Sequence, residues 1–251
     1  LTRLDALERY VLLDDARTEG AAPARLYRDP VAEMAVAGAD DLPRLFERLR
    51  AAQADGLHAA GWLSYEAGHA LEPRLADHVS EGRLGWFGFF EDYTEIAPGD
   101  VPALLPDGDG ASLGPLVPDI DEADYRSAIA RLLEWIAAGD IYQANFTFRA
   151  YAAYAGHPAA LYARIRERAR AGYGGIVHDG RQHLLSFSPE LFFALRGGEI
   201  AARPMKGTAA RLPDPALDRA AVADVQSDPK QRAENLMIVA LLRNDLSRRC
   251  Q

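Results

Sequence analysis

The sequence predicts an α+β fold in which antiparallel sheets carry packed helices. Hairpin signals, two strand-like runs joined by a short Gly-containing turn, outnumber strand–helix–strand repeats along the chain. Helix-like and strand-like runs also follow each other irregularly over 251 residues, and the 49% hydrophobic content is sufficient for a sizeable core. These observations favour antiparallel sheets over a doubly wound parallel sheet.

The first 96 residues are predicted to form an N-terminal α+β segment. We expect a short strand at 10–13, a helix at 41–52 and an aromatic strand around 86–90. Residues 97–118 contain five prolines and four glycines, which is typical of a linker or a long surface connection. The predicted boundary therefore lies within 97–118, and 119–251 forms the second part of the chain.

The second part begins with a helix at 121–138, whose apolar side chains share one stripe and whose stop signal is Gly139. The patterns beyond it predict, in order, a strand at 141–151, a helix opened by Pro158, and strands at 173–178 and 182–187 joined by an Asp179-Gly180 turn. Two more strands, 191–196 and 199–203, flank the turn signal Gly197-Gly198.

The last helix has a clear start signal, with Asp228 as N-cap, Pro229 at the first helical position and Gln231 in the capping-box slot. Residues 236–242 are apolar around the full circumference of this helix, which predicts that it is buried in the core.

Composition and charge exclude several functions. Lys and Arg total 28 against 37 for Asp and Glu, and the net charge of -9 argues against a nucleic-acid partner or an anionic membrane surface. No apolar run approaches a transmembrane span, and the first residues lack the plan of a signal peptide. Cys250 is the only cysteine and the six histidines form no tight ligand pair, so we expect a cytoplasmic protein without zinc.

Glu190 and Lys206 are expected to be neighbours because the predicted hairpin folds one run back against the other. A strict two-residue turn places Glu190 opposite Met205, whereas a one-residue bulge at the glycines places it opposite Lys206, and the sequence leaves both registers open. Cross-strand side chains approach closely, so the amine and the carboxyl group can act as a nucleophile and a proton donor. A surface ion pair is the alternative interpretation.

Glu234 comes directly before the apolar run of the last helix and shares a face with 238, 241 and 245, which directs it toward the interior. Two interpretations are open. Glu234 is either a glutamate stabilised by the helix N-terminus or a ligand of a divalent metal. Mg²⁺ typically uses one or two carboxylates together with waters and substrate oxygens.

Four runs in a fixed order resemble the chorismate-utilising enzymes: 139–145, 188–190, 203–208, and 232–239 followed by 242–246. The runs 10–17 and 63–68 are similar as well, so the resemblance covers nearly the whole chain. It implies the chorismate-binding fold, incomplete at the C-terminus, because family members continue with a Gly-rich substrate motif and a second metal-binding glutamate. Ala240 is a further departure, since the family usually has aspartate there.

Lys206 implies the aminodeoxychorismate branch of this family, because members that resemble anthranilate synthase carry a small residue at that position. By the resemblance, Lys206 attacks C2 of chorismate, Glu190 protonates the departing C4 hydroxyl, Gly207 and Thr208 bind substrate, and Glu234 is a ligand of Mg²⁺. Ammonia then adds at C4 and displaces the lysine.

The resemblance further implies a product, 4-amino-4-deoxychorismate for para-aminobenzoate and folate synthesis, and a partner. No run resembles a glutaminase, so a separate glutamine amidotransferase subunit is expected to supply ammonia. The alternatives are an anthranilate or isochorismate synthase-type enzyme, or a non-catalytic, truncated binding subunit.

Overall fold

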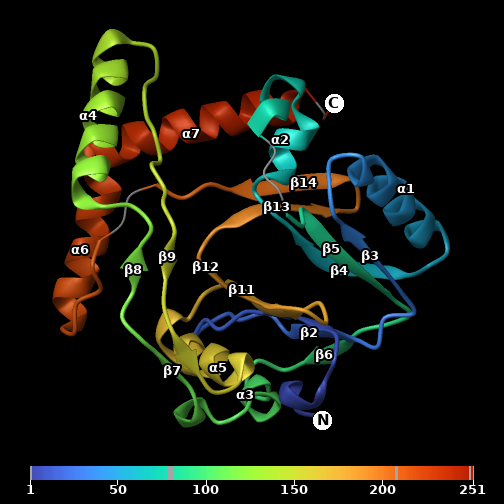
Figure 1. The fold of residues 1–251 in the computed structure, drawn as a ribbon. Coiled ribbons are helices and arrows are strands. Elements are labelled where there is room, and N and C mark those ends of the chain that lie inside the picture. Colours follow the sequence, from blue (N-terminus) through green and yellow to red (C-terminus); the bar gives the residue numbers. More distant parts are fainter. Residues whose placement is uncertain (1, 79–81, 207–208, 249, 251) are drawn as a thin grey trace.

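The structure is a computed structural model that describes residues 2–78, 82–206, 209–248 and 250 (Figure 1). Each strand pairing found in these residues is antiparallel, and helices accompany the sheets. The predicted α+β class with antiparallel sheets is thereby confirmed. No helix within the described ranges has both the length and the hydropathy needed to span a bilayer.

A five-stranded sheet forms the centre of the fold, in the order β12-β11-β1-β2-β6. Its strands are β1 (Tyr10–Asp14), β2 (Ala24–Arg28), β6 (Thr94–Ile96), β11 (Tyr173–His178) and β12 (His183–Ser188). Because β1 pairs directly with β11, strands from both sides of 97–118 share this sheet. The three ranges that we predicted as domains thus do not correspond to separate sheets, and the division itself stays a prediction.

A three-stranded sheet packs against one face of the five-stranded sheet. It consists of β3 (Ala32–Val36), β5 (Gly85–Phe90) and β4 (His58–Leu63), with β5 in the middle. Val11 and Tyr27 of the larger sheet bury themselves against Trp86 and Phe90 of the smaller one. Helix α1 (Asp41–Ala54) packs on the smaller sheet, and its Leu42 and Leu45 are buried in a cluster with Val36 and Leu84.

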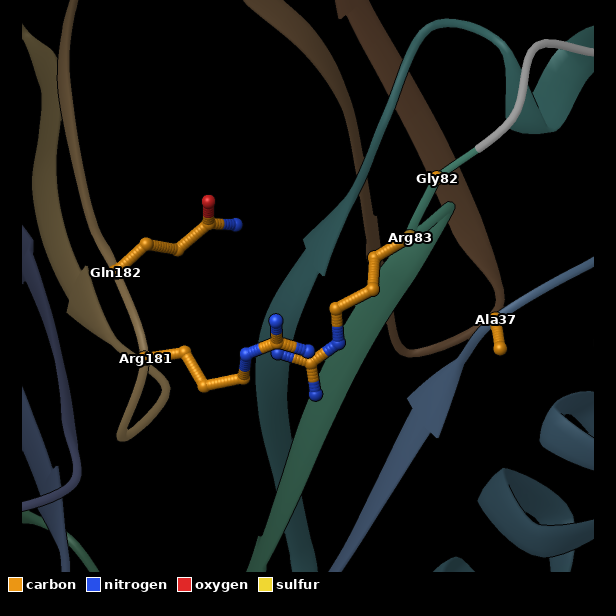
Figure 2. A pocket seen from close by; sticks show the side chains of 5 residues that line it. All are labelled: Ala37, Gly82, Arg83, Arg181 and Gln182. Carbon is orange, nitrogen blue, oxygen red and sulfur yellow. The ribbon is translucent and has the colours of Figure 1, made fainter.

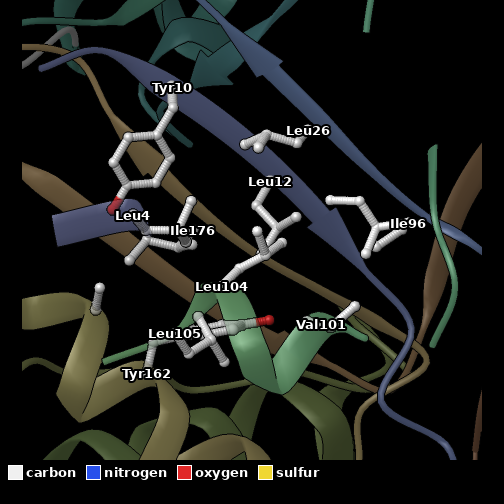
Figure 3. Packing of buried hydrophobic residues seen from close by; sticks show 12 residues of the cluster. Leu4, Tyr10, Leu12, Leu26, Ile96, Val101, Leu104, Leu105, Tyr162 and Ile176 are labelled. Atoms are coloured by element: carbon white, nitrogen blue, oxygen red, sulfur yellow. The ribbon is translucent and has the colours of Figure 1, made fainter. Parts of the chain in front are cut away.

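The opposite face of the five-stranded sheet carries the main core (Figure 3). Tyr10, Leu12 and Ile176 pack there against Tyr162 of α5 (Pro158–Ala169) and against α3 (Val101–Leu104). Val101 and Leu104 are 0% exposed. The expectation of a surface connection over 97–118 is therefore wrong for α3, because apolar side chains among the prolines supply part of the core.

One thin, two-stranded arm leaves this core. Along it, β7 (Ser112–Leu113) pairs with β10 (Tyr154–Ala155) and then β8 (Val117–Pro118) pairs with β9 (Ala150–Tyr151). Helix α4 (Glu122–Ala138) connects β8 to β9 and ends at Gly139, whose φ of 82° is the predicted left-handed stop. The strand expected at 141–151 is wrong except at its end, since only 150–151 have a ladder partner.

The C-terminal elements are β13 (Leu191–Arg196), β14 (Glu199–Arg203), α6 (Pro215–Ser227) and α7 (Pro229–Ser247). A short helix, α2 (Ala67–Leu71), and the 3-10 turns Leu4–Ala6, Pro73–His78 and Gly108–Gly110 complete the described elements. Helix α6 was not predicted, although Asp214 and Pro215 repeat the start signal of α7.

Helix α7 has the predicted N-cap, with the Asp228 carboxylate accepting the Gln231 backbone N–H at 2.9 Å. The prediction that this helix is buried is wrong for the chain described here. No residue of α7 is buried and Leu236 is 68% exposed, because within the described ranges its apolar circumference lacks a covering layer on most sides.

The β11–β12 hairpin has a longer loop than the expected two-residue turn. His178 pairs with His183, so 179–182 form the loop. The buried Asp179 carboxylate organises it by accepting the N–H groups of Arg181 and Gln182 at 2.9 and 3.0 Å and by pairing with Arg83 at 3.0 Å.

The imidazoles of His178 and His183 stack across this hairpin, with ring centroids 3.9 Å apart, and His157 lies edge-on to His183. Burial lowers the pKa of both stacked residues. For His183, burial and the neighbouring imidazoles of His178 and His157 together lower the pKa to about 4. Folding therefore favours the neutral form of both imidazoles.

We expect the free energy of unfolding to fall by about 1–2 kcal/mol between pH 7 and pH 5. The folded pKa of His183 is about 4, so the unfolded chain, with an ordinary histidine pKa, takes up more protons across this window. Urea unfolding midpoints at pH 7, 6 and 5 measure the slope. His183→Gln should flatten it, whereas the exposed His78→Gln should leave it unchanged; equal slopes in all three proteins would contradict this assignment.

Candidate active site

The β13–β14 hairpin carries the predicted site and turns through Gly197 and Gly198, whose φ values are 58° and 85°. Pairing runs from Arg196 with Glu199 to Ala194 with Ala201, as a strict two-residue turn requires. The bulge at the glycines, one of the two possibilities left open by the sequence, is therefore absent. Instead, the register shifts between Leu191 and Ala194, so that Leu191 pairs with Arg203.

The register shift is a bulge that places one extra residue in β13. It moves Glu190 by one position along the return strand, away from Lys206. Neither register left open by the sequence is therefore the observed one. The side chain compensates for the shift, because Glu190 Oε1 accepts the backbone N–H of Met205 at 3.1 Å. The carboxyl group is thereby held at the residue that directly precedes Lys206.

Glu190 and Lys206 are both exposed, and among the residues that the structure describes no ion pair joins them. The described residues do not enclose the two side chains, because only two strands make up this sheet. The roles of nucleophile and acid stay predictions.

Glu234 lies in the second turn of α7 and is 4.0 Å from Lys230 Nζ, an i,i+4 pair in which Lys230 is exposed and Glu234 is partly buried. The interpretation as a first-turn glutamate therefore does not apply. Within the described ranges no group of three or more acidic, histidine or cysteine side chains is arranged to hold a metal. Glu234 fits Mg²⁺ as a single ligand only, and water and substrate oxygens would supply the others. Gly207 and Thr208 lie outside the described residues.

A cavity of about 570 Å³ lies behind the hairpin. Its lining includes Phe187, Pro189 and Leu191, but neither Glu190 nor Lys206. The range 203–205 lines it as well, so the cavity lies next to the two predicted catalytic residues without including them.

A second cavity, of about 560 Å³, lies between the β11–β12 loop and the smaller sheet (Figure 2). Arg83 and Arg181 point toward one another there, with Gln182, Gly82 and Ala37 around them. None of the predicted site residues lines it. The buried Asp179 holds Arg83 in place, so this cluster joins the two sheets.

Comparison of the sequence with known proteins identifies the family of this chain. The sequence profile of the family described as chorismate binding enzyme matches residues 8–251. The chain therefore belongs to the chorismate-binding enzyme family.

Two kinds of relative are similar to this chain. Aminodeoxychorismate synthase component 1 of Salmonella typhimurium is 39% identical over 132 residues, which is 52% of this chain and 29% of that protein. The Escherichia coli protein of the same name is 37% identical over 124 residues, or 49% of this chain and 27% of that protein. Anthranilate synthase component 1 of Streptomyces coelicolor is 36% identical over 133 residues, covering 52% of this chain and 26% of that protein. In each case the matched region spans about a quarter of the relative.

Proposed function

We propose that this chain is part of an aminodeoxychorismate synthase component 1, which converts chorismate and ammonia to 4-amino-4-deoxychorismate for para-aminobenzoate and folate synthesis. The main support for this proposal is Lys206. A lysine at this motif position supplies a nucleophile that the anthranilate-type branch of the resemblance lacks. The matches to proteins named aminodeoxychorismate synthase component 1 support it.

In the proposed reaction, the Lys206 amine forms a bond to C2 of chorismate while the ring double bonds shift and the C4–O bond breaks. Glu190 gives its proton to the departing oxygen, which leaves as water. Ammonia then forms a bond to C4, the double bonds shift back, the C2–N bond breaks, and the lysine is released. The hydrogen bond from the Met205 N–H to one Glu190 carboxyl oxygen supports this role, since it would orient the acid group.

Mg²⁺ would be held in part by Glu234 and would offset the negative charge of a substrate carboxylate. A chain of net charge -9 needs such compensation to bind a dianion. We further propose that a glutamine amidotransferase subunit supplies the ammonia, since the relatives' names designate a component 1.

The decisive experiment is product analysis of the full-length protein with chorismate, Mg²⁺ and ammonia. We expect aminodeoxychorismate from the unmodified protein and a loss on the order of a hundredfold or more in Lys206→Ala, because the covalent route is removed. Arg126→Ala, which removes an exposed cation that contacts none of the proposed site residues, is the control and should change turnover little.

Anthranilate synthesis is the second candidate, since the Streptomyces coelicolor enzyme is nearly as similar. Anthranilate is fluorescent, so its release by the unmodified protein would favour this candidate and contradict the role of Lys206. The same product analysis distinguishes isochorismate from the other two products. Absence of any turnover together with chorismate binding would favour a non-catalytic binding subunit.

A further inference from the structure

Ser188, the last residue of β12, makes two hydrogen bonds to the backbone of Glu190. Its Oγ accepts the Glu190 N–H at 3.2 Å and donates to the Glu190 carbonyl oxygen at 3.0 Å. These two contacts close a tight local turn between β12 and β13. The turn fixes the direction in which the Glu190 side chain leaves the backbone.

The Glu190 side chain then connects this turn to the strand that leads to Lys206. The β13–β14 ladder ends at the pair of Leu191 with Arg203, beside the bulge. The Met205 N–H lies two residues beyond that pair and donates to Glu190 Oε1 at 3.1 Å. The contacts thus run from the Ser188 hydroxyl through Glu190 to the residue before Lys206.

We propose that Ser188 is a positioning residue that holds the Glu190 carboxyl group on the Met205 N–H, so that Oε2 can carry the transferred proton. The catalytic part of this inference rests on the proposed function. The geometry supports it because the Ser188 hydroxyl is hydrogen-bonded to the backbone of Glu190, and the Glu190 carboxyl group accepts the Met205 N–H. Ser188 acts through Glu190 and does not need to touch the substrate.

The first test does not depend on turnover. The chain contains three methionines, so ¹⁵N-methionine labelling gives a small set of amide signals, and Met205→Leu identifies the one required. An N–H that donates to a carboxylate reports the ionisation of that carboxylate. We expect the Met205 amide signal to follow a carboxyl titration, and Glu190→Gln to abolish that response.

Ser188→Ala should reduce the titration response of the Met205 amide, and Ser188→Thr, which keeps the hydroxyl, should restore it. An unchanged response in Ser188→Ala would overturn the proposal, as would a response in Ser188→Thr as weak as that in Ser188→Ala. The Met34 and Met237 amides, in β3 and α7, are internal controls for global unfolding.

The second test measures turnover of the full-length protein with chorismate and ammonia. Ser188→Ala should lower kcat by roughly ten- to a hundredfold with a small change in KM, because misplacing the acid affects the reaction more than binding. The acidic limb of the pH–kcat profile should shift, and Ser188→Thr should restore most of kcat. Activity of Ser188→Ala within twofold of the unmodified protein would overturn the proposal, whereas an inactive unmodified protein would contradict the proposed function alone.

Discussion

Replacing Gly61 with alanine is expected to lower the free energy of unfolding by about 2–4 kcal/mol. Gly61 lies in β4 opposite Phe87 of β5. An added Cβ would overlap the Trp86 carbonyl oxygen and would lie 2.7 Å from Phe87 Cα, and both are backbone atoms of the partner strand. Because β5 is paired with β3 on its other side, it cannot retreat without breaking a second ladder.

Urea denaturation monitored by tryptophan fluorescence measures this effect, since Trp62 and Trp86 are themselves paired across the affected strands. Gly38→Ala is the matched control, because a Cβ at Gly38 meets no atom within 4 Å. That substitution should be neutral or stabilising by up to about 1 kcal/mol, since it restricts the unfolded chain. Similar midpoints for the two variants would show that β4 and β5 are not packed as described.

Features fixed by contacts between near neighbours were predictable from the sequence. The end of α4 at Gly139 requires only a residue that accepts positive φ. The start of α7 depends on Asp228 and on an N–H three residues away. The turn between β13 and β14 depends on two adjacent glycines. Each of these signals lies within a few residues of the feature that it specifies.

Features set by distant segments were not predictable in the same way. Strand β1 pairs with β11, more than 150 positions along the chain, and no local pattern specifies that pairing. The burial of α3 and the exposure of α7 depend on which segments cover them, and periodicity reports only which side chains are apolar.

The candidate site combines both kinds of feature. The hairpin that brings the Glu190 run back toward the Lys206 run followed from the turn signal, but its register did not. A bulge in β13 has no distinctive local sequence here, so the observed register was not among the two that the sequence left open. The contact from Glu190 to the Met205 N–H replaces the direct pairing that was expected.

Arg166→Ala is expected to destabilise the chain by about 3–5 kcal/mol, since it leaves a buried carboxylate without its cation. Arg166 of α5 donates to both oxygens of Asp14, from Nε at 2.6 Å and from an Nη at 3.1 Å. The Asp14 side chain is 0% exposed. Only the Tyr162 hydroxyl, 2.9 Å away, would remain as a partner among these contacts.

The matched control is Arg126→Ala, which removes an exposed i,i+4 pair with Glu122 of equal length, 2.6 Å. Its side chains are more than 70% exposed, so we expect a loss below about 1 kcal/mol. Urea midpoints of both variants compare a buried ion pair with an exposed one. Equal losses would contradict the buried environment of Asp14.

A double variant distinguishes the cost of leaving the Asp14 carboxylate unpaired from the cost of losing the packing of Arg166. Asp14→Asn removes the buried charge, so adding Arg166→Ala to it should cost much less than Arg166→Ala alone, with a coupling energy of about 1–3 kcal/mol. Strict additivity would mean that Arg166 stabilises α5 through its packing and not through Asp14.

The coupling matters for the site, because α5 packs on β12 through Tyr162 and Phe187, and β12 ends at Ser188. Loosening this contact is therefore expected to disturb the turn that orients Glu190.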